Sequence, residues 1–466
     1  MSESERHPGF RSLEGERDEE LPAEGEIPTW LSGRLLRNGP GTFDVGGKRL
    51  RHWFDGLAML RSYEFDAGTV RYSNRYLRTE SYAKAVDGTL TGQFATDVNG
   101  LAKLRRLLGR IGFPEATDNA NVHVASIGGQ LVAQTEVPNW VGFDTETLET
   151  TGPFVFEDLF DPHMTTAHLV VDPVTGDQFG HALTFGRTHE YHLFRIPAGT
   201  RRREVITSIP TAKPAYVHSI GVSQSQLVLV ETPLRIAINR VLSPFREGFF
   251  DLLEWEPERE TQFLVVDRES GEVVTTSTTS PFFVFHTVNA FDDGEDVVVD
   301  LVEFEDDAIV GSLSLEAVSG EGFDNVPLGR LVRYRLSPDG RVERRRLYDG
   351  GTELPTVVAS RTTRPYRYVY GQATDRDGAN GLVKVDTETE TAREFWERDL
   401  YIEEPCPVQR PNGSAEDDGV VIAPALDVAA ERSVLLVLDA TTLEELGRAE
   451  LPHHEPFGFH GRFFQS

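Results

Sequence analysis

Four of the 13 histidines stand in settings that suit a metal site. The set consists of His168 in MTTAHLVVDPVTGD, His218 in AYVHSIGVSQSQLVLVE, His286 in VFHTVNAFDDGEDVVVD and His460 in EPFGFHGRF. Each lies at the start or edge of a strand-like run, and successive members are 50, 68 and 174 residues apart. Spacings near one structural repeat, or a multiple of it, let a ring of repeats point one imidazole each at a common axis. Neutral imidazole is a common metal ligand, although spacing alone is a weak signal.

The other chemistry-bearing residues give no competing site. A nucleophile elbow, a phosphate-binding loop and a zinc-protease helix are all missing from the sequence. His189 and His192 flank Glu190 in THEYHLF, but a strand-like context places their rings on different faces. We therefore expect no metal-binding role for the following histidines: His52, His163, His181, His189, His192, His453 and His454.

Seven hairpin signatures indicate the elements that must position these residues. In each, apolar alternating runs flank a turn rich in Asp, Pro, Ser, Thr and Gly. They are SYEFDAGTVRYSN, VGFDTETLETTG, LVVDPVTGDQFGHAL, FLVVDRESGEVVTT, VRYRLSPDGRVERRRL, LVKVDTETETAREF and LLVLDATTLEELGRAEL. Because no Pro- or Gly-rich linker divides the chain, an all-β propeller fits better than several domains. Two stacked β-sandwiches are the alternative. We expect a polar, poorly ordered segment over residues 1–28 and a single catalytic β-propeller domain over 29–466.

The composition excludes several classes of protein. With 46 Lys and Arg against 75 Asp and Glu, the net charge is −29, which disfavours nucleic acid as a partner. A content of 39% hydrophobic residues suffices for a folded core. The single cysteine, Cys406, allows no internal disulfide and favours a reducing cytoplasm. The N-terminus lacks the apolar region of a secretory signal, and no apolar run is long enough to span a membrane. Acidic, lysine-poor composition favours a salt-adapted organism, and an ordinary acidic protein is the alternative.

One basic segment departs from this acidic background. Residues 101–113, LAKLRRLLGRIGF, place apolar side chains at helical spacing and bases on the other faces. Such a helix is typical of membrane surfaces, and a helix packed on the protein body is an equal alternative. The residues expected to meet the membrane are Leu101, Leu104, Arg105, Leu108 and Ile111. A second apolar segment, PLRIAINRVLSPFREGFFDLLEW, is a candidate for the other half of a hydrophobic collar at a tunnel mouth.

Several motifs resemble those of the carotenoid cleavage oxygenases, a family of non-haem iron enzymes. The family includes carotenoid, apocarotenoid and stilbene dioxygenases and a retinoid isomerase. The motifs are LLRNGPGTF, HWFDGLAMLRSYEF, NRYLRTESY and FGFHG, and the resemblance runs from Leu31 to Phe463. It implies a seven-bladed β-propeller with inserted loops and a small helical cap over the metal site.

The resemblance also assigns the site. It makes His168, His218, His286 and His460 both catalytic residues and iron ligands. It further implies three supporting glutamates, which we place at Glu136, Glu353 and Glu404. Glu404 is preferred to Glu403 because it directly precedes Pro405.

Physical chemistry agrees with iron at such a site. Four neutral imidazoles suit Fe(II) and leave two positions of an octahedral ion open. Nearby carboxylates would offset the 2+ charge and fix each ring by accepting its other N–H. Structural zinc sites close with four ligands that usually include thiolates, which this chain cannot supply.

We therefore expect an Fe(II)-dependent dioxygenase with one Fe(2+) per subunit. Its partners would be O2 and an apolar polyene, a carotenoid or apocarotenoid, cleaved at a C=C bond to aldehyde or ketone products such as retinal. The enzyme would be cytoplasmic and peripheral on the inner face of the cell membrane. A stilbene or phenylpropanoid dioxygenase is one alternative. A non-oxidative isomerase or an apolar-ligand carrier is another, and it would consume no oxygen.

Overall fold

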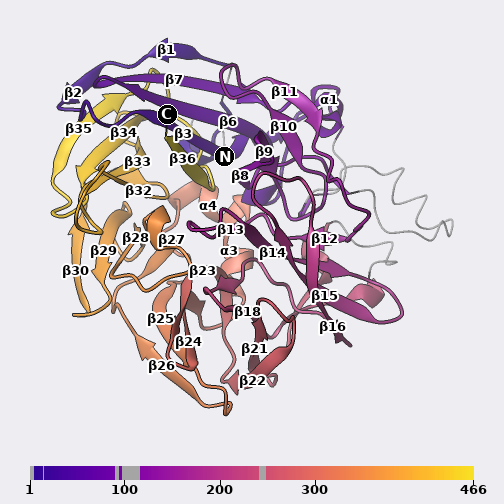
Figure 1. Cartoon of the computed structure of the whole chain (residues 1–466). Coiled ribbons are helices and arrows are strands. Elements are labelled where there is room, and N and C mark those ends of the chain that lie inside the picture. Colours follow the sequence, from indigo (N-terminus) through magenta and orange to yellow (C-terminus); the bar gives the residue numbers. More distant parts are fainter. Residues whose placement is uncertain (1–4, 14, 90–93, 97–115, 241–247, 466) are drawn as a thin grey trace.

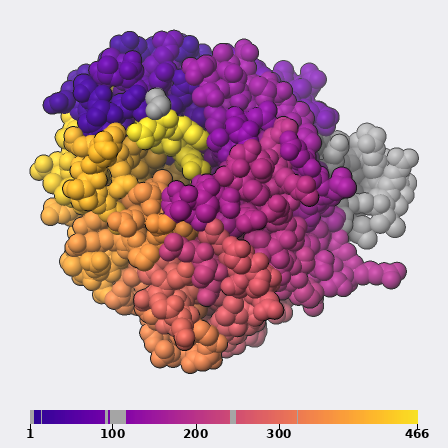
Figure 2. Space-filling model, in the orientation of Figure 1, coloured from indigo at the N-terminus to yellow at the C-terminus, as the bar shows by residue number. Residues whose placement is uncertain are grey.

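Seven antiparallel sheets form a ring in the computed structural model, which describes residues 5–13, 15–89, 94–96, 116–240 and 248–465 (Figure 1). The sheets follow one another in sequence order around the ring, so that its first and last sectors meet (Figure 2). The protein is therefore a seven-bladed β-propeller, as the hairpin signatures and the resemblance predicted, and not a pair of sandwiches.

The strands are grouped by blade. Blade 1 contains β1 (Asp18–Glu20), β7 (Thr69–Tyr76), β6 (Leu57–Asp66), β3 (Gly33–Thr42) and β36 (Gly461–Gln465). Blade 2 contains β8 (His123–Ile127), β9 (Gln130–Gln134), β10 (Val141–Phe143) and β11 (Thr150–Pro153). Blade 3 contains β12 (Met164–Thr165), β13 (Val170–Val171), β14 (Gln178–Thr184), β15 (His189–Ile196) and β16 (Glu204–Thr211). Blade 4 contains β17 (Gly221–Val222), β18 (Gln226–Glu231), β21 (Thr261–Asp267) and β22 (Val273–Thr279).

The remaining blades follow the same plan. Blade 5 contains β23 (Phe283–Asp293), β24 (Asp296–Phe304), β25 (Arg330–Leu336) and β26 (Val342–Arg346). Blade 6 contains β27 (Thr352–Thr356), β28 (Tyr368–Ala373), β29 (Gly381–Asp386) and β30 (Thr391–Phe395). Blade 7 contains β31 (Leu400–Ile402), β32 (Cys406–Gln409), β33 (Gly419–Asp427), β34 (Arg432–Asp439), β35 (Glu445–Glu450) and β2 (Ala23–Gly25). Two ribbons, β4 (Asp44–Val45) with β5 (Lys48–Arg49) and β19 (Leu234–Ile236) with β20 (Leu253–Trp255), lie outside the blades.

The seven predicted hairpins occur once in each blade. They join β6 to β7, β10 to β11, β13 to β14, β21 to β22, β25 to β26, β29 to β30, and β34 to β35. In four of these turns one aspartate accepts the backbone N–H groups two and three residues further on, over 2.7–3.3 Å. These are Asp144, Asp267, Asp386 and Asp439. The aspartate side chain thus stabilises the reversal that the sequence pattern indicated.

Both ends of the described chain close the ring. The C-terminal strand β36 pairs with β3 as the last strand of blade 1, and the N-terminal strand β2 pairs with β35 of blade 7. Within residues 1–28, which we expected to be poorly ordered, β1 also pairs with β7, and Phe10 is fully buried. Backbone pairing and one buried aromatic ring give this polar segment its place on the propeller. Poor order of residues 1–28 in solution stays a prediction, which hydrogen exchange can test.

Helices are few and short in the described part of the chain. They are α1 (Glu80–Val86), α3 (Ala308–Ser312) and α4 (Leu315–Glu321), with 3-10 turns η2 (Pro8–Phe10), η3 (Trp53–Asp55), η4 (Ile238–Arg240), η5 (Phe250–Leu252) and η6 (Ala359–Arg361). Figure 1 shows α3 and α4 near the centre of the ring. No helix among the described residues has the length and apolarity needed to cross a membrane.

Candidate metal centre

The four predicted histidines meet at one point in the structure. His168 lies between β12 and β13, His218 shortly before β17, His286 within β23 and His460 directly before β36. One ring nitrogen from each lies within 4.8 Å of the corresponding nitrogens of the others. The Nε2 atoms of His286 and His460 are 3.3 Å apart. Four blades therefore supply one imidazole each to a common site, as the sequence predicted.

A β-bulge in β23 orients the ring of His286. β23 shifts its register against β24 between Val284 and Thr287, so His286 lies in a β-bulge. A bulge bends a strand and redirects a side chain that would otherwise follow the regular alternation. The other three histidines lie just outside the regular strands, where the backbone is free of ladder geometry.

Each of the three predicted glutamates contacts a different histidine. Glu136 is 2.6 Å from Nδ1 of His218, Glu353 is 2.7 Å from Nδ1 of His286, and Glu404 is 2.7 Å from Nδ1 of His460. Because an ionised carboxylate only accepts, each Nδ1 carries the proton and donates it. When such a ring is neutral, its Nε2 lone pair is left free, which is the arrangement that metal-bound histidines show.

The donor set fits a divalent transition metal. The fourth ring, His168, has a buried Nε2 with no hydrogen-bond partner among the described residues. A buried unpaired nitrogen is costly, and an ion bound at the point where the four rings meet would satisfy it. Neutral imidazoles suit iron, zinc, copper and nickel, while nearby carboxylates offset the charge of a 2+ ion. The residues present therefore fit an iron ion of the kind the sequence predicted.

Burial and charge shift the pKa values of these side chains in different directions. Burial, reinforced by the neighbouring imidazoles, holds the pKa of His168 and of His460 well below the usual histidine value. For His286 burial acts in the same direction, but the carboxylates of Glu353, Glu404 and Glu136 together outweigh it and raise the pKa. Burial raises the pKa of Glu404 to about 7, against the opposing charge of Arg37. Lone pairs on His168 and His460 are thus available for a metal at neutral pH.

A second layer of contacts holds the glutamates, and sequence reasoning missed it. The Tyr216 hydroxyl donates to both carboxylate oxygens of Glu136, at 2.9 and 2.8 Å. Burial raises the pKa of this phenol well above its usual value, so it stays a neutral donor. Gly461 donates its N–H to Glu404 over 2.8 Å. No pattern in the sequence marked Tyr216, which stands two residues before His218 in YVH.

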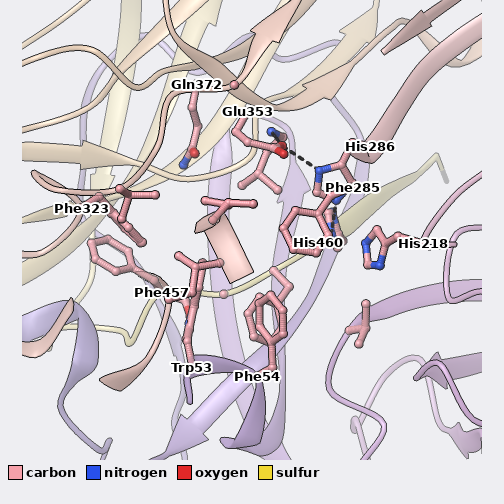
Figure 3. A pocket seen from close by; sticks show the side chains of 18 of the residues that line it. Trp53, Phe54, His218, Phe285, His286, Phe323, Glu353, Gln372, Phe457 and His460 are labelled. Atoms are coloured by element: carbon pink, nitrogen blue, oxygen red, sulfur yellow. Dashed lines mark hydrogen bonds and ion pairs between the residues drawn. The ribbon is translucent and has the colours of Figure 1, made fainter. Parts of the chain in front are cut away.

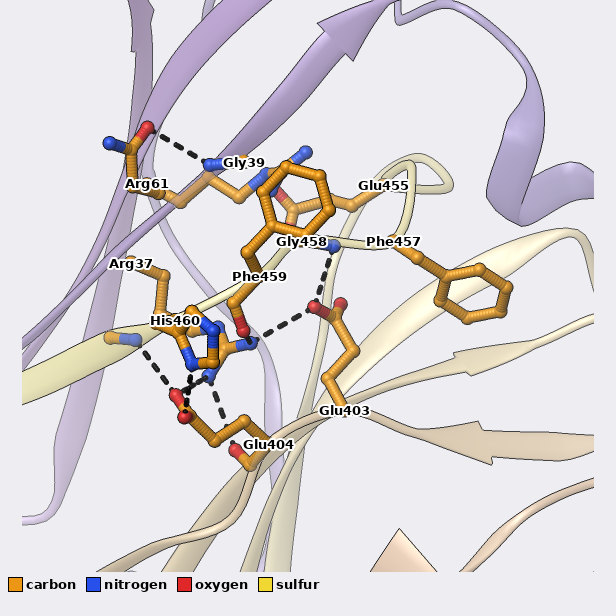
Figure 4. A network of polar contacts seen from close by, with 12 residues as sticks. Arg37, Gly39, Arg61, Glu403, Glu404, Glu455, Phe457, Gly458, Phe459 and His460 are labelled. Atoms are coloured by element: carbon orange, nitrogen blue, oxygen red, sulfur yellow. Dashed lines mark hydrogen bonds and ion pairs between the residues drawn. The ribbon is translucent and has the colours of Figure 1, made fainter. Parts of the chain in front are cut away.

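Arg37 connects this layer to the closure of the ring (Figure 4). Its guanidinium is 3.2 Å from Glu403 and 3.3 Å from Glu404, and it also donates to the carbonyl of Phe459 over 3.1 Å. Glu403 accepts the N–H of Gly458 over 2.9 Å. The two adjacent glutamates therefore have different roles, and the choice of Glu404 for His460 agrees with the geometry. Arg37 lies in LLRNGPGTF, so that motif was the available signal.

A fifth imidazole lies beside the cluster. The ring of His123 has its centroid 5.6 Å from that of His168 and 5.4 Å from that of His460. Burial, with the charges of Arg462 and Arg37, lowers the pKa of His123 to about 3. It stands at the first position of β8 in NVHV, where nothing in the sequence distinguished it.

The histidines that we set aside lie outside the four-residue group. His52 caps η3 by accepting the N–H of Phe54, and its Nε2 contacts the carbonyl of Val310. His181 contacts the carbonyl of Val217 over 3.0 Å, and His192 lies between the hydroxyls of Thr184 and Ser208. The remaining members of that group, His163, His189, His453 and His454, are likewise not among the clustered residues.

A cavity of about 260 Å³ opens beside the metal centre (Figure 3). His218, His286 and His460 line one side of it. Its walls carry the aromatic side chains of Trp53, Phe54, Phe94, Tyr216, Phe249, Phe285, Phe304, Phe323, Tyr401, Phe457 and Phe459. Ile309 and Leu313, at α3, also line it, so this short helix forms part of the cavity wall. A concave, aromatic-lined surface of this kind suits a flat, apolar ligand.

The proposed membrane segment lies outside the described residues. Residues 101–113, with Leu101, Leu104, Arg105, Leu108 and Ile111, fall within the range 97–115 that the structure does not describe. Of the second apolar segment the structure describes β19, η4, η5 and β20, and Phe249 reaches the cavity wall. The hydrophobic collar at a tunnel mouth stays a prediction, because Phe249 is the one described residue of this segment at the cavity wall.

Comparisons with known proteins agree with the fold and the site. The family described as "Retinal pigment epithelial membrane protein" matches residues 10–465. A carotenoid-cleaving dioxygenase of Mustela putorius furo is 30% identical, over 94% of this chain and 92% of its own. Carotenoid cleavage dioxygenase 8 of Arabidopsis thaliana is also 30% identical, over 98% of this chain and 85% of its own.

A solved structure shows the same architecture. Cobalt-substituted Synechocystis ACO, an apocarotenoid oxygenase, superposes with a TM-score of 0.87 at 26% identity, covering 100% of this chain and 99% of that chain. The chain belongs to the carotenoid cleavage oxygenase family, over its full length. It is a carotenoid cleavage dioxygenase-family enzyme with a four-histidine metal site, and this family is one of non-haem iron enzymes.

Proposed function

We propose that this enzyme is an Fe(II)-dependent dioxygenase that cleaves one C=C bond of a carotenoid or apocarotenoid with O2. One iron ion per subunit would be held by His168, His218, His286 and His460 and would supply the centre at which O2 is activated. The C=C and O=O bonds break and two C=O bonds form, so the reaction needs no added reductant. The products are two aldehydes or ketones, with retinal among the candidates.

One observation carries this proposal: four buried imidazoles converge beside an aromatic cavity while three of them donate to carboxylates. The carboxylates fix the tautomer and orientation of the rings, which keeps the ligand geometry rigid. The aromatic walls pack against a conjugated chain and exclude water from the reacting bond. Glu136, Glu353 and Glu404 are positioning residues in this scheme, and Arg37 and Tyr216 position two of them.

The decisive experiment measures products and oxygen together. Iron-loaded protein is incubated with β-carotene, apocarotenals and resveratrol under labelled O2, and product masses are determined. We expect one labelled oxygen in each carbonyl product of a carotenoid-type substrate. Cleavage of resveratrol alone would favour a stilbene dioxygenase, and a rearranged product without oxygen uptake would favour an isomerase. Ligand binding without any product would indicate a carrier.

Metal content tests the ligand set separately. His218→Ala removes one ring and leaves Glu136 without its imidazole donor. We expect this variant to retain no iron by metal analysis, because three ligands hold the ion poorly once a buried site is opened. His189→Ala, at the start of β15 outside the cluster, serves as the matched control and should keep its iron. Full iron occupancy in His218→Ala would refute the four-ligand assignment.

We also propose that residues 101–113 hold the enzyme on the inner face of the cell membrane, where an apolar substrate is dissolved. The support is the pattern of apolar and basic residues in this segment, in a chain of net charge −29. Replacing Leu104 and Leu108 by Glu removes part of the apolar stripe, so it should reduce co-sedimentation with anionic liposomes. The assay is run at high salt, where binding through charge alone is screened. Leu159→Glu, at an exposed position elsewhere, is the control and should have no effect. Unchanged co-sedimentation of the double variant would rule the segment out.

A further inference from the structure

The wall of the cavity away from His218 carries polar side chains. In Figure 3, Gln372 and Phe323 lie on the opposite side of the cavity from His218. Gln372 belongs to β28, and Asn380 lies directly before β29 in the same blade. Both line the cavity, and Asn380 is only 5% exposed. Polar amides are therefore presented to a space whose surface is mostly apolar.

Both amides are fixed by the backbone of one residue, Ile402. Gln372 donates its Nε2–H to the carbonyl of Ile402 over 2.6 Å, and Asn380 accepts the N–H of Ile402 at Oδ1 over 2.5 Å. Since a backbone carbonyl only accepts and a backbone N–H only donates, these bonds determine which end of each amide is oxygen. In an extended strand the N–H and C=O of one residue point the same way, so the two amides lie side by side along β31.

Each amide has one polar atom left over. Oε1 of Gln372 is an acceptor and Nδ2 of Asn380 is a donor, and neither has a hydrogen-bond partner among the described residues. In a cavity with apolar walls, unpaired groups of this kind are costly unless a ligand or water satisfies them. The pair offers one donor and one acceptor at fixed positions.

A hydroxyl group is the complement of such a pair. Its O–H can donate to Gln372 while its oxygen accepts from Asn380, whereas an aldehyde only accepts and a hydrocarbon does neither. A carboxylate end is less suited, because the nearby cation Arg376 is already paired with Asp375 and Glu394. The chemistry of the wall thus selects a neutral group that both donates and accepts.

We propose that Gln372 and Asn380 form a subsite for a hydroxyl group at one end of the substrate. The proposal rests on the function proposed above, because it takes the remainder of the substrate to be an apolar polyene within the same cavity. It adds that hydroxylated carotenoids or apocarotenoids are preferred over their hydrocarbon-ended counterparts. The subsite acts on binding and orientation, and it takes no part in the bond cleavage.

Anaerobic binding tests the subsite without relying on catalysis. Dissociation constants are measured through quenching of protein fluorescence for three apocarotenals that share one skeleton. At the end-ring position one carries a hydroxyl, one a hydrogen and one a methoxy group. We expect the hydroxyl ligand to bind about tenfold more tightly than the hydrogen ligand, as two hydrogen bonds in a buried site allow. The methoxy ligand accepts a hydrogen bond but cannot donate one. Its affinity should therefore be lower than that of the hydroxyl ligand.

The variant Asn380→Asp isolates the donor. Aspartate keeps an oxygen for the N–H of Ile402, so the bond that fixes this side chain is retained, but it replaces the free Nδ2 donor by an acceptor. The hydroxyl preference should fall to about threefold or less. Asn412→Asp, at an exposed turn position, adds the same charge elsewhere and should leave the preference unchanged.

The outcomes separate this inference from the proposed function. Equal dissociation constants for the three ligands in the wild-type protein, or no binding of any of them, would overturn the subsite. A preserved tenfold preference in Asn380→Asp would also overturn it. If the hydroxyl preference appears but no ligand is cleaved in air, the subsite stands and the dioxygenase assignment fails. If all three ligands are cleaved but bind with equal affinity, the dioxygenase assignment stands and the subsite fails.

Discussion

Glu353 offers a sharp test of how the carboxylates support the metal centre. Its Oε2 lies 2.7 Å from Nδ1 of His286 and also accepts the N–H of Leu354. The Glu353→Leu variant removes the acceptor for both donors, while Glu353→Gln keeps an acceptor but removes the charge. The side chains of Glu353 and His286 are only 16% and 13% exposed, so water replaces the lost partner poorly.

The expected losses follow from the bonds removed. A buried donor left unpaired costs about 1–3 kcal/mol. Loss of a carboxylate that orients a ligating histidine lowers metal affinity by about 10–100-fold. Because tenfold in affinity corresponds to about 1.4 kcal/mol, the two figures agree for Glu353→Leu. For Glu353→Gln a neutral hydrogen bond replaces a charge-assisted one, a loss of about 1 kcal/mol, so we expect about a fivefold weaker affinity.

Anaerobic competition between protein and a coloured Fe(II) chelator measures this affinity directly. The order should be wild type, then Glu353→Gln, then Glu353→Leu, with circular dichroism showing the same β content throughout. Glu388→Leu, at an exposed turn in the same blade, is the matched control and should bind iron as the wild type does. Iron binding by Glu353→Leu within twofold of wild type would refute the view that the carboxylate orients His286.

Two further predictions concern Glu404 and its surroundings. Arg37→Met leaves Glu403 and Glu404 buried without their cation, so the free energy of unfolding of the metal-free protein should fall by about 3–5 kcal/mol in urea titrations. Arg341→Met, whose arginine side chain is 61% exposed, should change it little, and equal losses in the two variants would contradict this role. Iron affinity should rise with pH through about 7, because burial raises the pKa of Glu404 to about 7 and iron binding favours its ionised form. This slope should flatten in Glu404→Gln, and a wild-type affinity independent of pH between 6 and 8 would contradict the assignment.

The sequence allowed the blades and the metal ligands to be predicted because their signals are local. An aspartate followed by Thr, Ser or Gly determines a hairpin within a few residues, and each of the seven signatures became one blade. The four histidines stand beside strand-like runs, and FGFHG is a compact motif around His460. Glu404 was distinguished from Glu403 by a single neighbour, Pro405. For all of these residues the immediate sequence carried the information.

The supporting contacts could not be predicted because their partners are distant in the chain. Arg37 meets Glu403 across 366 residues, and no periodicity relates the two. His123 adjoins the cluster only because β8 of blade 2 lies next to β36 of blade 1. Gln372 and Asn380 become neighbours through the backbone of Ile402, which belongs to the following blade. Such contacts depend on how the blades pack, which local patterns do not encode.

The closure of the propeller and the metal centre share the same residues. His460 directly precedes β36, the strand that joins the end of the chain to blade 1 through β3. Arg37 of β3 holds Glu404, and Glu404 holds His460. An ion bound by His460 and by histidines of blades 3, 4 and 5 therefore ties the closing strand to the opposite side of the ring. Because ligand binding to the native state alone stabilises it by mass action, metal binding favours the closed ring. The closed ring in turn aligns the four imidazoles, so ring closure and metal affinity are coupled through Arg37.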